Sequence, residues 1–306
     1  MKNIIAILTL FVASETLAQS SAQNLSMMAM TNACKGCDLS NSQLVGVDFS
    51  GKDLTTANFS GSVADTANFS GAELYWVLLD GGSFKSANFD GAKIIVTETD
   101  RTMEQRLSGV SDGIRQTNID FRSANFKNAQ VDITVYESIF DGANFSGAKQ
   151  VNINGGNCLF LSSRFNDLLN RWRGKPSSFR NISVVGVSKP RYVSANSFCS
   201  YRGNVSNAKF DNSNFDGDGS NDGFLVVDGD LTGSSFRGAS LKSSLFSRSN
   251  LTGADFTNAN LTDANFEGAN LTSVNFTGAN LDGANLAGAI LCETIDPKGT
   301  MLYFGC

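Results

Sequence analysis

A large apolar residue recurs at every fifth position over two long stretches of the chain. The C-terminal stretch has thirteen such positions from Leu231 to Leu291 without a miss, and the N-terminal stretch has twelve from Leu39 to Ile94, of which only Ala64 is undersized. A period of five fits neither an α-helix, which repeats every 3.6 residues, nor a plain strand, which alternates every two. The sequence therefore predicts neither a helical bundle nor an ordinary sheet.

Most repeats also have a small residue two positions before the large one, as Ala254 precedes Phe256. In an extended segment, residues two apart point to the same side, so both side chains face one interior. Three polar or glycine residues then turn the chain before the pattern starts again. A bend in every repeat winds the chain into a coil, and coils stacked about 4.8 Å apart bury a continuous apolar column.

Runs such as 254–258, 259–263 and 264–268 resemble the repeats of pentapeptide repeat proteins. The resemblance extends over most of residues 37–293. It implies an all-β fold, namely a right-handed quadrilateral β-helix (a solenoid) with four repeats per turn and with loop insertions where the repeat is interrupted.

Four repeats per turn require that residues twenty apart stack on one another. The sequence meets this requirement with one column of Leu231, Leu251, Leu271 and Leu291, and with a second column that contains Phe236, Phe256 and Phe276. Like residues over like residues fill equal volume in each turn. Of the 23 Phe residues, 18 occupy such central positions, so we predict that they form the core and not an aromatic binding stripe.

The residue between the small and the large position points outward. In the last stretch it is usually Asn, as at Asn250, Asn260 and Asn270. Because stacked Asn side chains hydrogen-bond from layer to layer, we predict a structural role for them.

The N-terminus has the pattern of a secretory signal peptide. Lys2 is followed by an apolar run from Ile4 to Ala13 and then by small and polar residues. We predict a signal peptide over 1–18 with cleavage after Ala18, and Ala22 is the second candidate site. The apolar run is too short to span a bilayer and no later run approaches that length, so we expect a soluble periplasmic or secreted protein.

The six cysteines suggest disulfides, because their number is even and the chain is predicted to be exported. Six cysteines permit fifteen pairings, but the positions near the two chain ends suggest covalent locks on terminal structure. The candidates are Cys34, Cys37, Cys158, Cys199, Cys292 and Cys306.

The central positions change register at three breaks in the repeat. We expect a single unit over 34–306, interrupted near 96–117, 169–200 and 217–228 and closed by a C-terminal cap over 292–306. Each change of register requires a bulge or a loop.

The second break is basic, although the whole chain has a net charge of −5. The segment 164–191 contains seven Lys and Arg residues and only one acidic residue. This segment is the best sequence candidate for a surface that contacts an acidic or phosphate-bearing partner. The alternative is structural, because Arg beside Trp also stacks to seal a loop onto the coil. The candidate binding residues are Arg171, Trp172, Arg173, Lys175 and Arg180.

The third break has oxygen side chains at alternate positions followed by Gly223, which is typical of the first half of a calcium loop. The candidate ligands are Asp216, Asp218, Ser220 and Asp222. Gly229 stands where a calcium loop has its twelfth-position Glu, so a turn-forming loop that absorbs the change of register explains the composition equally well.

No His occurs in the chain, which excludes His-based triads, His-ligated zinc and His-ligated haem. We expect a non-enzymatic scaffold without a cofactor that binds a protein or an envelope glycan through its loops. The acidic chain argues against general binding of nucleic acid. Two alternatives stay open. The family resemblance implies a DNA-mimicking modulator of topoisomerases, and the third break suggests a calcium-stabilised surface protein.

Overall fold

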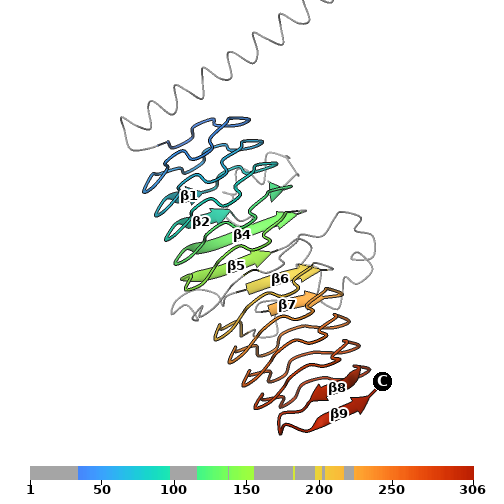
Figure 1. The fold of residues 1–306 in the computed structure, drawn as a ribbon. Helices are drawn as coiled ribbons and strands as arrows, with labels where there is room; N and C mark the ends of the chain where they lie inside the picture. The colour runs from blue at the N-terminus through green and yellow to red at the C-terminus, as the bar shows by residue number, and fades with distance from the viewer. Residues whose placement is uncertain are drawn as a thin grey trace, which may run out of the picture.

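In the computed structural model, the described residues are 34–96, 116–136, 138–154, 182, 197–201, 204–216 and 224–306. They form a right-handed quadrilateral β-helix, whose coils succeed one another from the N-terminal to the C-terminal end (Figure 1). The predicted signal peptide over 1–18 lies outside the described residues.

One side of the coil is a parallel sheet of seven strands. Its order is β1-β2-β4-β5-β6-β7, and β3 pairs with β4. The last two strands, β8 and β9, form a separate antiparallel hairpin at the C-terminal end. The strands are β1 (Glu73–Tyr75), β2 (Lys93–Val96), β3 (Gln116–Thr117), β4 (Gln130–Tyr136), β5 (Gln150–Asn154), β6 (Ser197–Tyr201), β7 (Phe224–Val227), β8 (Leu291–Ile295) and β9 (Met301–Phe304).

The predicted stacking at twenty is confirmed wherever the repeat is uninterrupted. Asp230 bridges to Asn250 and Asn250 to Asn270, in parallel. Because each repeat has five residues, this offset corresponds to four repeats in every turn. The short bridges between coils replace the long strands of an ordinary sheet, since the chain bends after every repeat.

A β-turn forms each corner of the coil. In the repeat that contains Leu54, the N–H of Ala57 donates to the carbonyl of Leu54 at 2.9 Å, and Thr56 between them has a φ of 58°. A positive φ at the third residue of a turn is the mark of type II and favours Gly. Gly71 occupies the corresponding position in the repeat of Phe69, with a φ of 66°.

The outward Asn residues have a second role that the sequence did not reveal. In the repeat 269–273, four of the five backbone N–H groups donate to backbone carbonyls. The fifth, on Thr272, donates to the side-chain oxygen of Asn270 at 3.0 Å. Bonds from coil to coil also occur, as the amide of Asn285 donates to the side-chain oxygen of Asn265 at 3.3 Å. Asn thus completes the hydrogen bonding of its own turn as well as linking coils.

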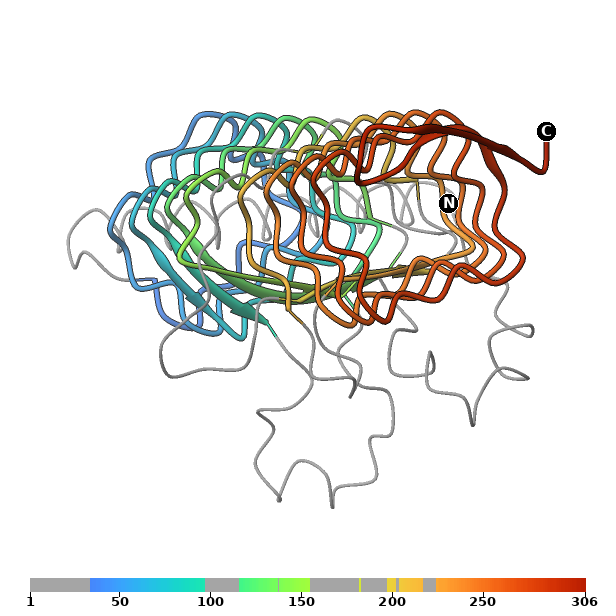
Figure 2. The same cartoon turned by 90° about the horizontal axis from the view of Figure 1, so that it is seen from below.

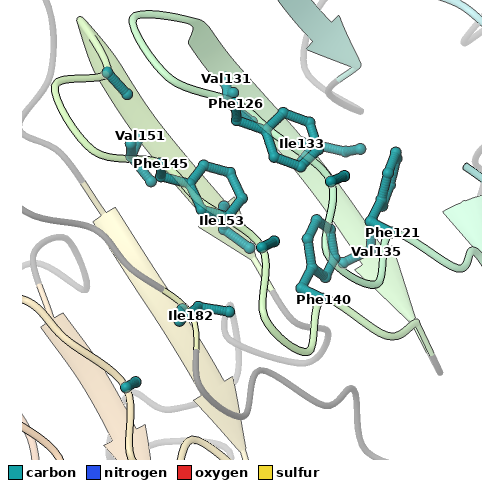
Figure 3. Close-up of a cluster of buried hydrophobic side chains, with 14 of the residues drawn as sticks. Phe121, Phe126, Val131, Ile133, Val135, Phe140, Phe145, Val151, Ile153 and Ile182 are labelled. Carbon is teal, nitrogen blue, oxygen red and sulfur yellow. The ribbon is translucent and has the colours of Figure 1, made fainter. Parts of the chain in front are cut away.

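The core consists of stacked aromatic and aliphatic columns. The rings of Phe126 and Phe145 lie 4.6 Å apart and nearly parallel (Figure 3). Sixteen of the eighteen predicted Phe centres lie among the described residues, and all sixteen are buried. Phe160 and Phe165 lie outside them. Phe224 in β7 is also buried, although it stands next to a break and the period did not predict it.

Disulfides lie at both ends of the described coil. Cys34 is buried at a central position, and its bond to Cys37 spans the first turn. At the other end Cys292 in β8 is bonded to Cys306, which follows β9. Figure 1 shows β8 and β9 at this end of the coil. Of the remaining candidates, Cys199 lies in β6 and Cys158 lies outside the described residues.

Candidate functional site

The breaks in the repeat all open beside the seven-stranded sheet. The described chain stops at the end of β2 and resumes with β3, stops again at the end of β5, and resumes with β7 after Asp216. The strands of this sheet run together along one side of the coil (Figure 2). Everything that interrupts the repeat therefore leaves from, or returns to, the same side of the molecule.

The core column that contains Ile94 continues across the first break. Ile94 pairs with Val131, and Val131 pairs with Val151, and all three side chains are buried. Across the first break the stacked residues are 37 positions apart instead of twenty, as Asn88 and Asn125 show. The insertion thus lengthens the sequence between two coils without displacing the coils themselves.

Gln116, the first described residue after the first break, hydrogen-bonds to the coil before the break. Its buried side-chain oxygen accepts a hydrogen bond from the N–H of Leu79 at 2.7 Å, and its amide donates to the carbonyl of Val77 at 3.2 Å. The Gln side chain thus pairs two buried backbone groups of the preceding coil. Sequence reasoning missed this residue, because a single Gln beside a break carries no periodic signal.

Next to this break the sheet presents an aromatic and charged surface, the Trp76 surface, formed by Glu73, Tyr75, Trp76 and Lys93. Trp76 is 46% exposed and Tyr75 is half-buried, and their ring centroids lie 6.0 Å apart. Lys93 Nζ lies 2.9 Å from Glu73 Oε1. The hydrogen bond to Glu73 and the neighbouring Tyr75 raise the pKa of the Lys93 ammonium group above its ordinary value, so Lys93 is a cation at neutral pH.

Trp76 has a backbone conformation that a bulky residue rarely adopts. It stands at the positive-φ corner of its turn, with a φ of 54°. Among the described residues, the other non-glycine residues with a positive φ are Asn, Asp, Thr, Ser, Arg and Glu, and none of them is aromatic. Sequence reasoning missed Trp76, because the repeat pattern places it among the polar turn residues.

The other end of the sheet differs from the Trp76 surface. In β7, Leu225 and Val227 stand at outward positions, yet they are only 2% and 6% exposed. The strand is therefore buried on both faces. The end of the sheet that contains β1 and β2, by contrast, presents the ring of Trp76 to solvent.

The basic segment predicted as a binding surface lies outside the described residues. This applies to Arg171, Trp172, Arg173, Lys175 and Arg180. The chain connects them between the end of β5 at Asn154 and the start of β6 at Ser197.

Of the predicted calcium ligands, only Asp216 is described, and Asp218, Ser220 and Asp222 are not. The Oδ1 atom of Asp216 accepts hydrogen bonds from Ser240 Oγ at 2.6 Å and from the N–H of Lys242 at 3.1 Å. These contacts give Asp216 a structural role in linking two coils. Within the described part of the chain, no three Cys, Asp or Glu side chains are grouped as a metal site requires.

The described residues also contain no helix with the length and apolar character needed to cross a membrane.

Comparison with solved structures finds other proteins with pentapeptide repeats. One is HetL from the cyanobacterium Nostoc, a protein involved in the regulation of heterocyst differentiation. It is 18% identical, the match covers 87% of this chain and 91% of HetL, and the TM-score is 0.31. Another is trypsin-treated QnrB1, a plasmid-mediated fluoroquinolone resistance protein, with 18% identity, coverage of 79% and 88%, and a TM-score of 0.30. A third comes from the thylakoid lumen of Arabidopsis thaliana, with 24% identity, coverage of 44% and 79%, and a TM-score of 0.14.

No curated protein matches the sequence at a significant level. The family model for pentapeptide repeats matches residues 34–63, 230–263 and 259–295, with eight copies. These segments contain the turns and twenty-residue stacking described above. Over these matched segments, the chain is therefore similar to pentapeptide repeat proteins.

Proposed function

We propose that this protein is an exported, non-enzymatic scaffold that binds an acidic or phosphate-bearing partner, either a protein or an envelope glycan, through the loops of one face. The observation that carries the proposal is that the breaks in the repeat all adjoin the seven-stranded sheet. A rigid coil that presents several loops on one side is a common way to build a binding surface.

Charge supports the choice of partner. The basic segment between 164 and 191 has seven basic residues and one acidic residue, in a chain whose net charge is −5. In the chain this segment lies between β5 and β6, which are strands of the same sheet. Such a local reversal of charge increases the rate of association with an acidic surface and selects against basic partners.

The carboxyl groups support a role other than catalysis. A general acid at neutral pH needs a raised pKa. In the described residues, each carboxyl group with a resolved shift has a lowered pKa. At Asp53 and Asp38 the cause is hydrogen bonding to Thr55 and Ser40 in the same turns. At Asp120 burial opposes the charge, but Arg122 outweighs it.

Export is part of the proposal, and it rests on the basic, apolar and small residues of 1–18 and on the even number of cysteines. Mass measurement of secreted protein tests it, and we expect the mature chain to begin at Gln19 or, by the second candidate site, at Gln23. A retained Met1 would contradict it.

The binding role is tested by pulldown from envelope extract with three proteins. These are the wild type, a variant without 169–200, and the triple variant Arg171→Gln, Arg173→Gln, Lys175→Gln. The matched control is Lys127→Gln, Lys209→Gln, Lys242→Gln, which removes the same charge from exposed positions on the coil. We expect partners that bind the wild type and the control but neither of the loop variants, with binding weakened by added salt. Equal recovery by all four proteins would overturn the proposed function.

A further inference from the structure

We propose that the Trp76 surface is a subsite for a neutral glycan, in which one sugar ring stacks on the indole of Trp76 and its hydroxyl groups pair with Glu73 and Lys93. This inference goes beyond the proposed function, because it adds a second, uncharged ligand class and uses residues of the coil itself and none from the loops.

The fold does not need a Trp at this corner. The corresponding turn positions in the two adjoining repeats are Gly71 and Gly81, which have φ values of 66° and 64°. Trp76 adopts the same left-handed conformation, which is disfavoured for a residue with a bulky side chain. With almost half of its surface exposed, it also gains less from burial than the core residues do. A conformation that opposes local preference, combined with an exposed aromatic ring, indicates a functional constraint.

The backbone of the coil holds Trp76 in place. Its N–H donates to the carbonyl of Ile95 in the next coil at 3.0 Å. The carbonyl of Tyr75 accepts a bond from the N–H of Thr56 in the preceding coil at 2.8 Å. Tyr75 lies against the indole at an interplanar angle of 46°. The backbone that carries the two rings is therefore preorganised, which reduces the entropy lost on binding.

The polar neighbours indicate a ligand without net charge. Glu73 and Lys93 are about half exposed, and their opposite charges cancel across 2.9 Å. A polyanion gains nothing from this pair, whereas neighbouring hydroxyl groups can donate to the carboxylate and accept from the ammonium group. A sugar ring combines such hydroxyl groups with an apolar face of C–H groups that fits a flat indole.

A protein partner is the main competing occupant, since Trp and Tyr are frequent in protein interfaces. Two observations favour the glycan. Lys and Glu are depleted in protein interfaces, but here Lys93 interacts with both Glu73 and Tyr75, and Tyr75 lies against Trp76. The described aromatic platform also consists of two rings only, which matches one or two sugar units better than it matches the surface that a stable protein contact requires.

Fluorescence tests the proposal, because the chain has only two Trp residues. The variant Trp172→Phe leaves Trp76 as the sole indole. We would titrate it with cellohexaose, chitohexaose, xylohexaose and maltohexaose, and with polygalacturonate as an anionic comparison. We expect a saturable change in Trp76 emission with at least one neutral hexasaccharide and none with polygalacturonate.

Calorimetry with the same sugars then tests the individual residues in the otherwise wild-type protein. We expect Trp76→Gly to weaken binding at least tenfold, and Glu73→Gln and Lys93→Gln to weaken it severalfold. Because Gly suits the turn, Trp76→Gly should melt at the same or a higher temperature than the wild type, so loss of binding cannot be attributed to unfolding. The control Val45→Ala changes an apolar side chain that is 57% exposed and should bind as the wild type does.

Three results would overturn the inference. They are no saturable signal with any of the four sugars, equal affinity in Trp76→Gly, or a Trp76 response to protein from envelope extract without a response to sugar. None of these depends on residues 169–200, so the pulldown with loop variants can succeed or fail independently.

Discussion

The side-chain oxygen of Asn270 accepts a hydrogen bond from the backbone N–H of Thr272 at 3.0 Å, and the Thr272 hydroxyl donates to the same oxygen at 2.7 Å. The other four backbone N–H groups of this repeat donate to backbone carbonyls. The Thr272 N–H is therefore the one for which the coil provides no backbone acceptor. A polar residue before the central position therefore satisfies a group that the geometry of the coil leaves unpaired.

Replacement of Asn270 by Ala should lower the free energy of unfolding by about 1 kcal/mol, because the Thr272 N–H loses its acceptor. Asn270→Asp keeps an oxygen at that position and should retain most of the stability. Urea denaturation measures both, with Val45→Ala as the exposed control. A loss in the Asp variant equal to that in the Ala variant would contradict this role for the side-chain oxygen.

The Phe column should respond to truncation as a well-packed interior does. Phe256 lies between Phe236 at 4.7 Å and Phe276 at 5.4 Å. We expect Phe256→Ala to cost about 3–5 kcal/mol, since it opens a cavity between two rings. The matched control is Phe304→Ala, at a side chain that is 65% exposed, and it should change stability by less than about 0.5 kcal/mol. Similar losses at both positions would be inconsistent with the stacked core.

Ser62 and Gly82 occupy equivalent positions in adjacent coils, and alanine substitution at the two positions should change the stability in opposite directions. A Cβ atom on Gly82 would lie 2.7 Å from a ring carbon of Phe84 and 2.9 Å from the carbonyl oxygen of Leu79, so Gly82→Ala should cost about 1–3 kcal/mol. In the coil before it, the buried Ser62 hydroxyl has no hydrogen-bond partner. Ser62→Ala should therefore stabilise the protein by about 1 kcal/mol. Thermal denaturation of both variants decides, and a stabilising Gly82→Ala would show that the coil widens there.

Acid should destabilise the protein through the carboxylates of its turns. Asp38 and Asp53 have lowered pKa values because Ser40 and Thr55 donate hydrogen bonds to them. At Asp255 burial opposes the charge, but Thr257 and Arg237 lower the pKa. Groups with a folded pKa below the ordinary value of 3.8 stabilise the protein above that value and lose this contribution as the pH falls through the folded pKa.

We therefore expect the melting temperature to fall as the pH is lowered below about 4. The triple variant Asp38→Asn, Asp53→Asn, Asp255→Asn keeps an acceptor oxygen in each turn but does not titrate there, so its melting temperature should fall less steeply. Calorimetry between neutral pH and pH 3 provides the comparison. Parallel curves for the two proteins would assign the acid sensitivity to other groups.

The two described disulfides should differ in their contribution. Cys292 and Cys306 close a segment with a separation of 14 residues, and Cys34 and Cys37 one of 3. In the chain-entropy account, removal of the first pair by alanine substitution should cost about 3 kcal/mol and removal of the second about 2 kcal/mol. Denaturant titration without reductant measures both losses. The reverse order would mean that the buried packing of Cys34 outweighs loop closure.

Much of the coil could be predicted from the residues alone. The spacing of Leu231, Leu251 and Leu271 predicts the stacking that the structure shows, because one column of the core repeats at a constant interval. The residues of the candidate site could not be predicted from the repeat. Gln116 and Trp76 each break the pattern once, and a single departure from a repeat has no meaning until its neighbours in the adjoining coils are known.

The sequence by itself determined the coil, its interior columns and its polar corners, since these depend on contacts at fixed separations of two, five and twenty residues. Only the tertiary structure decided which side of the coil adjoins every break and brought the side chain of Gln116 to the N–H of Leu79. The physical reason is that an insertion changes the sequence distance between two coils but leaves the hydrogen bonds that stack them unchanged. Residues on the two sides of a break therefore become neighbours at separations that the repeat does not contain.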